Sequence, residues 1–200
     1  YSCLSDIAID GNKSKTALGG IYAGYVTNWV FERIAVYDFH NPSAIGLWLD
    51  HAYQIAIRDC YVRLGSKGAG KRGKACFKLS ASTADPVHTT HITYDNCLAQ
   101  YSGTGFLLAA LGNRGGNMTI RQSASGNHDC GILIEDFYRE VLIENTLIEN
   151  TSASGVMMKA ALPFNIHNVS LEEITFYENT TALLADNVEG LSLERLRFAG

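Results

Sequence analysis

Glu140-Val141-Leu142-Ile143-Glu144-Asn145 is echoed by Asn168-Val169-Ser170-Leu171-Glu172-Glu173 and again by Gly190-Leu191-Ser192-Leu193-Glu194-Arg195. In each copy two apolar residues enclose a third residue, and a carboxylate follows the second apolar residue. This alternation with a period of two predicts a β-strand that ends at a charged corner. Three copies in the last third of the chain indicate a repeat architecture.

The same register continues through the rest of the chain. The leading apolar position falls at Ile7, Trp29, Ile55, Ile92, Met118, Val141, Val169 and Leu191. Two residues later the column reads Ile9, Phe31, Ile57, Tyr94, Ile120, Ile143, Leu171 and Leu193. Because alternate residues of a strand face the same side, we expect both columns to line one continuous core.

Each repeat also contains a second strand, usually preceded by glycine: Gly20-Ile21, Gly46-Leu47, Gly105-Phe106, Gly131-Ile132 and Gly155-Val156, with Ala182-Leu183 as a variant. No uninterrupted helical pattern separates the strands. Repeats of this length are typical of leucine-rich repeats, propeller blades or a parallel β-helix. The first needs a leucine-asparagine consensus and the second about four strands per repeat, so we predict an all-β parallel β-helix.

Length and composition predict one domain. A chain of 200 residues with 46% hydrophobic content is long enough for a single elongated core over residues 1–200. About seven to eight coils would form a rod on the order of 36 Å long. The chain begins at Tyr1 without Met and stops at Gly200 partway through a coil, so we expect a fragment of a longer protein.

Charge and cysteine content exclude several classes of function. A net charge of −4 argues against a nucleic-acid partner, and no apolar run is long enough to predict a membrane span. The five cysteines, Cys3, Cys60, Cys76, Cys97 and Cys130, lack paired zinc-ligand spacing. We interpret them as free, mostly core thiols, which favours assembly in a reducing environment.

Ala8-Ile9-Asp10-Gly11-Asn12, followed by Gly20-Ile21-Tyr22, combines with the repeat into a pattern that covers essentially the whole chain. The pattern resembles the right-handed parallel β-helix of the pectate-lyase-like superfamily, which includes pectin-degrading enzymes, uronate epimerases and bacteriophage tailspikes. This resemblance of fold implies a protein that binds or acts on carbohydrate, often as a trimer when it is a tailspike.

Trp48-Leu49-Asp50-His51 is similar to the Trp-Ile-Asp-His stretch of pectate lyases. Acidic residues recur at the same corner of other repeats, so a structural role is an alternative. Pectate lyases also need a calcium-binding carboxylate cluster and a basic residue that abstracts a proton. Calcium is therefore expected only if the protein is a lyase, and we predict no metal ligands and no other cofactor.

Two insertions and a neighbouring loop predict a site on the side of the rod. The insertion Gly65–Lys74 carries Lys71 and Arg72, which we expect to contact an acidic glycan, or else to form a surface loop or subunit contact. The insertion Ser82–His91 supplies Asp85, His88 and His91, and the loop 112–116 supplies Arg114. We predict Asp50, Asp85 and His88 as acid-base residues. The predicted substrate contacts are Lys71, Arg72, Arg114, His51 and His91.

Glu144, Glu172 and Glu194 should form one column, with neighbours about one strand step apart and next-neighbours about two strand steps apart. Such spacing brackets the carboxylate separations of glycosidases, about 5 Å in retaining and about 6.5 to 9.5 Å in inverting enzymes. A surface charge ladder that includes Arg195 and Arg197 explains the same pattern.

The outward positions of the second strand form an apolar stripe, interrupted by Lys78, that would suit a homotrimer interface. Its apolar members are Tyr22, Trp48, Leu107, Leu133, Met157 and Leu184. Together with this stripe, the resemblance to the pectate-lyase-like superfamily leads us to predict the trimeric body of a phage tailspike-like protein of the virion tail, which binds and depolymerises a bacterial surface polysaccharide. The alternatives are a free-standing bacterial lyase or uronate epimerase, secreted or on the cell surface, and a non-catalytic adhesin or structural spike.

Overall fold

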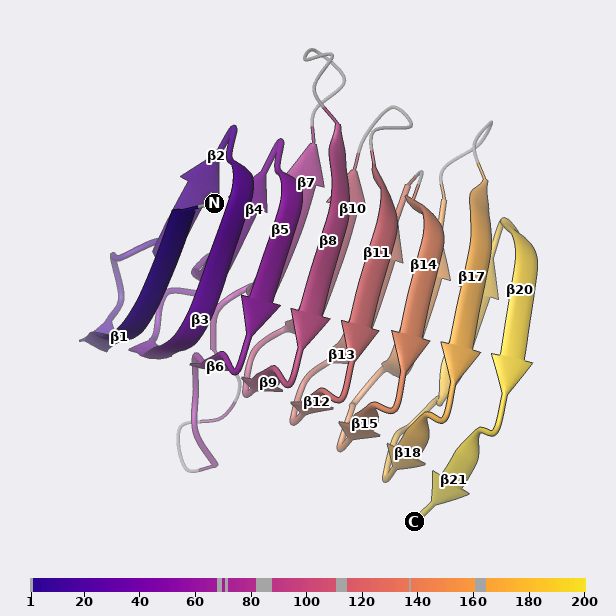
Figure 1. Ribbon diagram of the computed structural model, residues 1–200. Coiled ribbons are helices and arrows are strands. Elements are labelled where there is room, and N and C mark those ends of the chain that lie inside the picture. The colour runs from indigo at the N-terminus through magenta and orange to yellow at the C-terminus, as the bar shows by residue number, and fades with distance from the viewer. Residues whose placement is uncertain are drawn as a thin grey trace.

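The computed structural model describes residues 2–67, 70, 72–81, 88–110, 115–136, 138–160 and 165–200, without the side chains of Ala110 and Tyr138. Over this part of the chain the named elements are all β-strands, and neighbouring strands pair in parallel. They wind a right-handed β-helix of about seven turns, with the two ends of the chain at opposite ends of the rod (Figure 1). The prediction of an all-β parallel β-helix is confirmed.

Three stacks of strands form the faces of the rod. The first face contains β1 (Ser2–Ser14), β3 (Thr27–Phe39), β5 (Tyr53–Arg58), β8 (Thr89–Asp95), β11 (Gly115–Arg121), β14 (Tyr138–Glu144), β17 (Ile166–Glu172) and β20 (Val188–Glu194). The short second face contains β6 (Tyr61–Arg63), β9 (Leu98–Gln100), β12 (Ala124–Gly126), β15 (Leu147–Glu149), β18 (Thr175–Tyr177) and β21 (Arg197–Ala199). The third face contains β2 (Gly19–Gly24), β4 (Ile45–Asp50), β7 (Ala75–Ala81), β10 (Thr104–Ala110), β13 (Cys130–Glu135), β16 (Ser154–Lys159) and β19 (Leu183–Asp186).

The predicted core columns are in register from the second coil onward. Trp29 lies opposite Ile55 and Phe31 lies opposite Ile57, and the same two columns continue to Leu191 and Leu193. On the third face the inward column runs from Ile21 to Leu183. These columns meet in one apolar core along the rod, and alternate residues of each strand are left on its outer surface.

The predicted register of the first coil is wrong by five residues. Leu4, and not Ile9, lies opposite Phe31, whereas Ile7 and Ile9 pair with Ile34 and Val36. The corner at Asp6 interrupts the alternation, but the pair Ile7 and Ile9 that follows it has the same two-residue spacing as the first-face pair Trp29 and Phe31, so the local pattern fits either register. The positive φ of Asp6, 60°, identifies the true corner.

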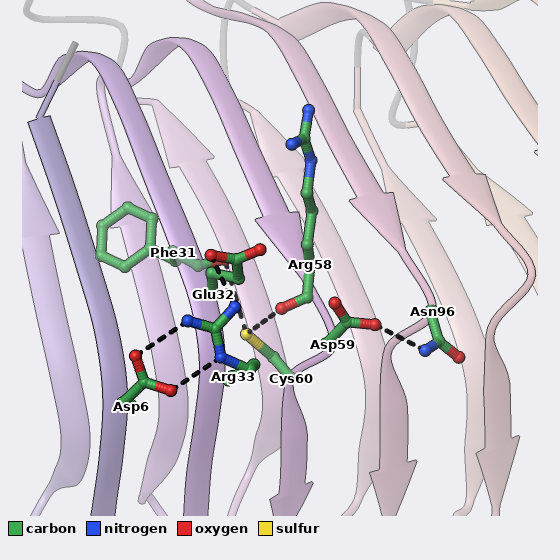
Figure 2. A network of polar contacts seen from close by, with 8 residues as sticks. All are labelled: Asp6, Phe31, Glu32, Arg33, Arg58, Asp59, Cys60 and Asn96. Carbon is green, nitrogen blue, oxygen red and sulfur yellow. Dashed lines mark hydrogen bonds and ion pairs between the residues drawn. The ribbon is translucent and has the colours of Figure 1, made fainter.

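A column of residues with positive φ turns the chain from the first face to the second. Its members are Asp6, Arg33, Asp59, Asn96, Gln122, Asn145, Glu173 and Arg195. Their side chains pair between coils: Arg33 Nε donates to Asp6 at 2.7 Å and Asn96 donates to Asp59 at 2.6 Å (Figure 2). These pairs are part of the corner geometry. Because they are exposed, they add little to the free energy of unfolding.

A column of small residues permits the tight approach of the second and third faces. A Cβ atom on Gly46 would lie 2.2 Å from Val62 Cγ1, and one on Gly105 would lie 2.0 Å from Ser125 Oγ. Both distances are far below van der Waals contact, which explains why glycine precedes these strands in the sequence. Cys76 is fully buried at the equivalent position of β7.

All five cysteines are free thiols, and all but Cys3 are buried, as predicted for core residues. Within the described part of the chain, no helix has the length and apolar character to cross a membrane.

Candidate functional site

On the outer surface of the third face, aromatic, hydroxyl and charged side chains of the described residues lie close together. One outward column contains Tyr22, Trp48, Lys78 and Leu107, which lie directly opposite one another in successive strands. A second outward column, two residues further along each strand, contains Asp50, Ser80, Ala109 and Glu135. The two columns lie side by side because successive outward positions of a strand face the same way.

Trp48 lies at the centre of this surface, between a phenol and an ammonium group. The Tyr22 ring meets its edge at a centroid distance of 4.9 Å, and Lys78 Nζ lies 3.8 Å from the centroid of its ring. Burial is the main cause of a lowered pKa for Lys78, and the positive charge of Lys74 adds to it. A lysine in this setting is a candidate base.

A chain of hydrogen bonds links Trp48 to the carboxylate of Asp50. Trp48 Nε1 donates to Ser80 Oγ at 2.6 Å, and Ser80 Oγ donates to Asp50 Oδ1 at 2.6 Å. The Tyr22 hydroxyl donates to the other oxygen, Oδ2, at 3.3 Å. Burial first, and then the charge of Asp50, raise the pKa of Tyr22, so its phenol stays protonated and is a candidate acid.

His51 follows Asp50 in the sequence, but its side chain is turned away from the outer surface of the third face. Its side chain is 4% exposed, and its ring stacks on Tyr25 at 4.8 Å and 2°. Nδ1 lies 3.3 Å from Asp50 Oδ2. His51, predicted as a substrate contact, is therefore packed beside Asp50 and is not among the residues that line the third-face groove described below.

The two outward columns enclose a groove of about 390 Å³. Its lining includes Trp48, Asp50, Lys74, Lys78, Ser80, Leu107, Ala109 and Glu135. The small side chains of Ser80 and Ala109 leave the space, and Lys159 pairs with Glu135 at 2.8 Å. The groove therefore combines an aromatic ring, two ammonium groups and two carboxylates.

The predicted site residues do not all converge here. Asp50 lies in the groove, whereas His88 is exposed just before β8 and His91 lies on the first face with its ring 5.2 Å from Tyr53. Arg72 precedes β7, at the opposite end of the third face from Asp50. Asp85, Lys71 and Arg114 lie outside the described residues.

Sequence reasoning did not assign Lys74, Lys78, Ser80 or Glu135 to the site. The sequence contains one indication of a role for Lys78, because Lys78 is the single charged residue of the outward apolar stripe. The stripe itself is confirmed as one column, but its exposure is uneven. Tyr22 is 59% exposed and Leu184 48%, whereas Leu107 is only 3% exposed.

The carboxylate column predicted on the first face is confirmed. Glu144, Glu172 and Glu194 lie opposite one another, and Arg195 pairs with Glu194 at 3.3 Å. Toward the N-terminus the same column alternates in charge through Arg121, Asp95, Arg58 and Glu32. This continuity favours the charge-ladder interpretation.

The described residues do not fit the calcium site that lyase chemistry by analogy would require. No group of three or more acidic, histidine or cysteine side chains among them is arranged to hold a metal ion.

Comparison with known proteins shows similarity of fold only. No protein-family model and no curated protein matches the sequence. Among solved structures, the periplasmic alginate epimerase AlgG aligns with a TM-score of 0.56 and 12% identity, over 90% of this chain and 47% of its own. The Azotobacter vinelandii mannuronan C-5 epimerase AlgE6 A-module aligns with a TM-score of 0.42 and 12% identity, over 99% of this chain and 74% of its own. The chain thus spans about half the length of AlgG, and shares with it the parallel β-helix fold.

Proposed function

We propose that this protein binds an acidic polysaccharide of the uronate class in the third-face groove and removes the proton next to the sugar carboxylate, as an epimerase or lyase does. The observation that carries the proposal is the position of Lys78 over the Trp48 ring, with Tyr22, which donates to Asp50, on the strand at the other side of β4. An aromatic ring can contact the apolar face of a sugar, and ammonium groups attract its carboxylate.

The residues of the groove divide into binding and proton-transfer roles. Lys74 pairs with the uronate carboxylate and stabilises the negative charge that develops when the neighbouring C–H bond breaks. Lys78, as the neutral amine, takes that proton. The electron pair moves into the carboxylate. The Tyr22 hydroxyl then releases its hydrogen bond to Asp50 and gives its proton to the opposite face of the carbon as the electron pair returns, which yields the epimer. The tyrosinate and the Lys78 ammonium exchange protons with solvent to restore the site. Asp50 holds the Tyr22 hydroxyl for this step, at 3.3 Å.

Elimination is the alternative outcome of the same proton abstraction. The electron pair then expels the glycosidic oxygen at the adjacent ring carbon, the oxygen leaves with a proton, and the new chain end carries a C=C bond. Epimerisation and elimination need the same base, so the groove supports both activities and does not distinguish between them.

Hydrolysis is less well supported by this geometry. Asp50 and Glu135 are the two carboxylates of the groove, and their positions lie three strand steps apart, about 14 Å. Inverting hydrolases need about 6.5 to 9.5 Å and retaining enzymes about 5 Å. This separation favours the lyase or epimerase alternative over the tailspike depolymerase predicted from the sequence.

Incubation of the protein with polyuronates in D₂O tests the proposal. Polymannuronate is the first choice, because AlgG is an alginate epimerase, with polygalacturonate as a second polymer and neutral dextran as the control. NMR would detect deuterium at the carbon next to the carboxylate, and ultraviolet absorbance would detect unsaturated ends. Lys78→Met should abolish both signals, whereas the exposed Lys13→Met should leave them unchanged. Binding and exchange that survive in Lys78→Met would overturn the assignment.

Assembly and location are part of the same proposal. A uronate polymer would be met in the cell envelope or outside the cell. A trimer formed through the whole outward stripe would cover Tyr22 and Trp48, so we propose that any trimer contact uses the opposite end of the stripe, around Leu184.

A further inference from the structure

We infer that the groove continues into a second subsite for an uncharged sugar unit, so that the preferred ligand is a heteropolysaccharide in which uronate and neutral sugars alternate. This inference rests on the proposed function and specifies its substrate. It excludes a polymer made of uronate alone as the best ligand.

The second subsite is a separate hollow that shares Trp48 with the groove. It measures about 440 Å³ and lies over the β2–β4 pair, lined by Leu18, Tyr22, Ser43, Ile45 and Trp48 among others. Small-ligand sites commonly measure about 300 to 1,000 Å³. Leu18 is 71% exposed and Tyr22 59%, so these apolar surfaces are accessible to a ligand.

The two hollows differ in charge. Lys74, Lys78, Asp50 and Glu135 line the first, whereas none of the described residues that line the second carries a charge. A carboxylate in the second hollow would lose its hydration without meeting a cation, which is costly. The C–H surface of a neutral sugar would instead replace water on Leu18 and the aromatic rings, which is favourable.

The order of the strands places the two hollows one after the other along the rod. β4 lies between β2 and β7 in the sheet, so Trp48 has Tyr22 on one side and Lys78 on the other. Tyr22 and Lys78 are two strand steps apart, about 9.5 Å. The hollows themselves meet at Trp48, which lines both, so adjacent units of one glycan chain can occupy them. An anionic unit at Lys78 would therefore be followed by a unit over Leu18 and Ile45, with the Tyr22 hydroxyl, bonded to Asp50, at the boundary between the two units.

Affinity for two matched oligosaccharides tests this inference. One is a β-linked oligoglucuronate, and the other alternates glucuronate with glucose at the same length. We expect the alternating ligand to bind about tenfold more tightly, despite its lower charge, because it leaves no carboxylate unpaired. Leu18→Glu should remove that preference. Leu147→Glu, which adds the same charge to an exposed leucine on the second face, should retain it.

The outcomes separate this inference from the proposed function. Equal affinity for the two ligands, or a preference that survives Leu18→Glu, would overturn the neutral subsite and leave the uronate groove intact. Loss of binding of both ligands in Lys78→Met supports the groove. Binding of neither ligand by the wild-type protein, or unchanged binding of both in Lys78→Met, would overturn the groove and the subsite together. Circular dichroism and thermal unfolding of each variant establish that it is folded.

Discussion

The ammonium group of Lys78 lies 3.8 Å from the centroid of the Trp48 ring, in the neighbouring strand of the third face. This contact places a partly desolvated cation on an aromatic surface at the side of the rod. Neither residue defines a ligand type alone. Together with Asp50 and Tyr22, they form the surface on which the proposed binding of an anionic sugar rests.

The pH dependence of exchange should report on Lys78. Its pKa lies below the ordinary value of 10.5 because of burial and the nearby charge of Lys74. The neutral amine is the active form, so we expect the rate of deuterium uptake to rise with pH and to level off below 10.5. Lys74→Gln removes a like charge and should shift the profile to higher pH. A profile that does not move in Lys74→Gln would argue against Lys78 as the base.

Asp50→Asn should separate binding from turnover. The substitution removes a negative charge beside the anion site, so we expect affinity for polyuronate to rise about two- to fivefold. It also weakens the hold on the Tyr22 hydroxyl, so kcat should fall by about 100-fold. Steady-state kinetics and equilibrium binding measure the two effects. Equal losses in both would indicate simple damage to the fold.

Gly131→Ala should destabilise the rod. The added Cβ would lie 2.6 Å from Gly155 O and 2.6 Å from Ile148 Cγ2, where the second and third faces meet. Overpacking of this kind costs about 1 to 3 kcal/mol in the free energy of unfolding, measurable by urea denaturation. Gly116→Ala is the matched control, because its Cβ would lie 3.3 Å from both Arg139 Cγ and Arg139 O, 0.7 Å further than the contacts at Gly131. Equal stability of the two variants would refute the packing argument.

Thiol labelling should distinguish Cys3 from the other four cysteines. Burial raises the pKa of Cys76 and of Cys130 to about 12, and the thiolate is the reactive form. Ellman's reagent should therefore modify one thiol in the native protein and five after denaturation. Rapid modification of several thiols in the native state would contradict the buried core positions.

The same two thiols predict a loss of stability in alkali. Because their folded pKa values are raised, their stabilising contribution is fully present below the unfolded value of 9.0. It declines as the pH rises from 9.0 toward about 12, since only the unfolded chain can then release these protons. Urea unfolding of Cys130→Ala at pH 8 and pH 10 should show a smaller decline than the wild type. An identical decline would assign the effect to other groups.

Sedimentation equilibrium tests the predicted trimer. Leu184 is an exposed apolar member of the outward stripe, so Leu184→Glu should shift a trimer toward monomer, whereas Leu147→Glu should not. A monodisperse wild-type monomer would remove the trimer proposal and leave the groove proposal unchanged.

The sequence by itself determined the architecture. Its repeated apolar pairs, such as Ile55 with Ile57 and Val169 with Leu171, are separated by polar corners. This pattern can bury its apolar side only when the strands stack in register. The glycine at the start of most third-face strands was equally visible, although its reason, the clash of a Cβ with Val62 or Ser125, required coordinates. The register of the first coil was not determined, because Ile7 and Ile9, which follow the corner at Asp6, have the same two-residue spacing as the apolar pairs that precede the corner in other coils.

Only the tertiary structure decided which side chains act together. Asp50 was identified from its sequence motif, but its partners Ser80 and Lys78 come from another strand, and His51, adjacent in sequence, turns inward. A parallel coil brings residues from successive repeats to within one strand step, at sequence separations set by the loops between them. The local sequence pattern indicates which residues face outward. The three-dimensional path of the coil determines which outward residues become neighbours, and therefore where a cation, a carboxylate and an aromatic ring meet.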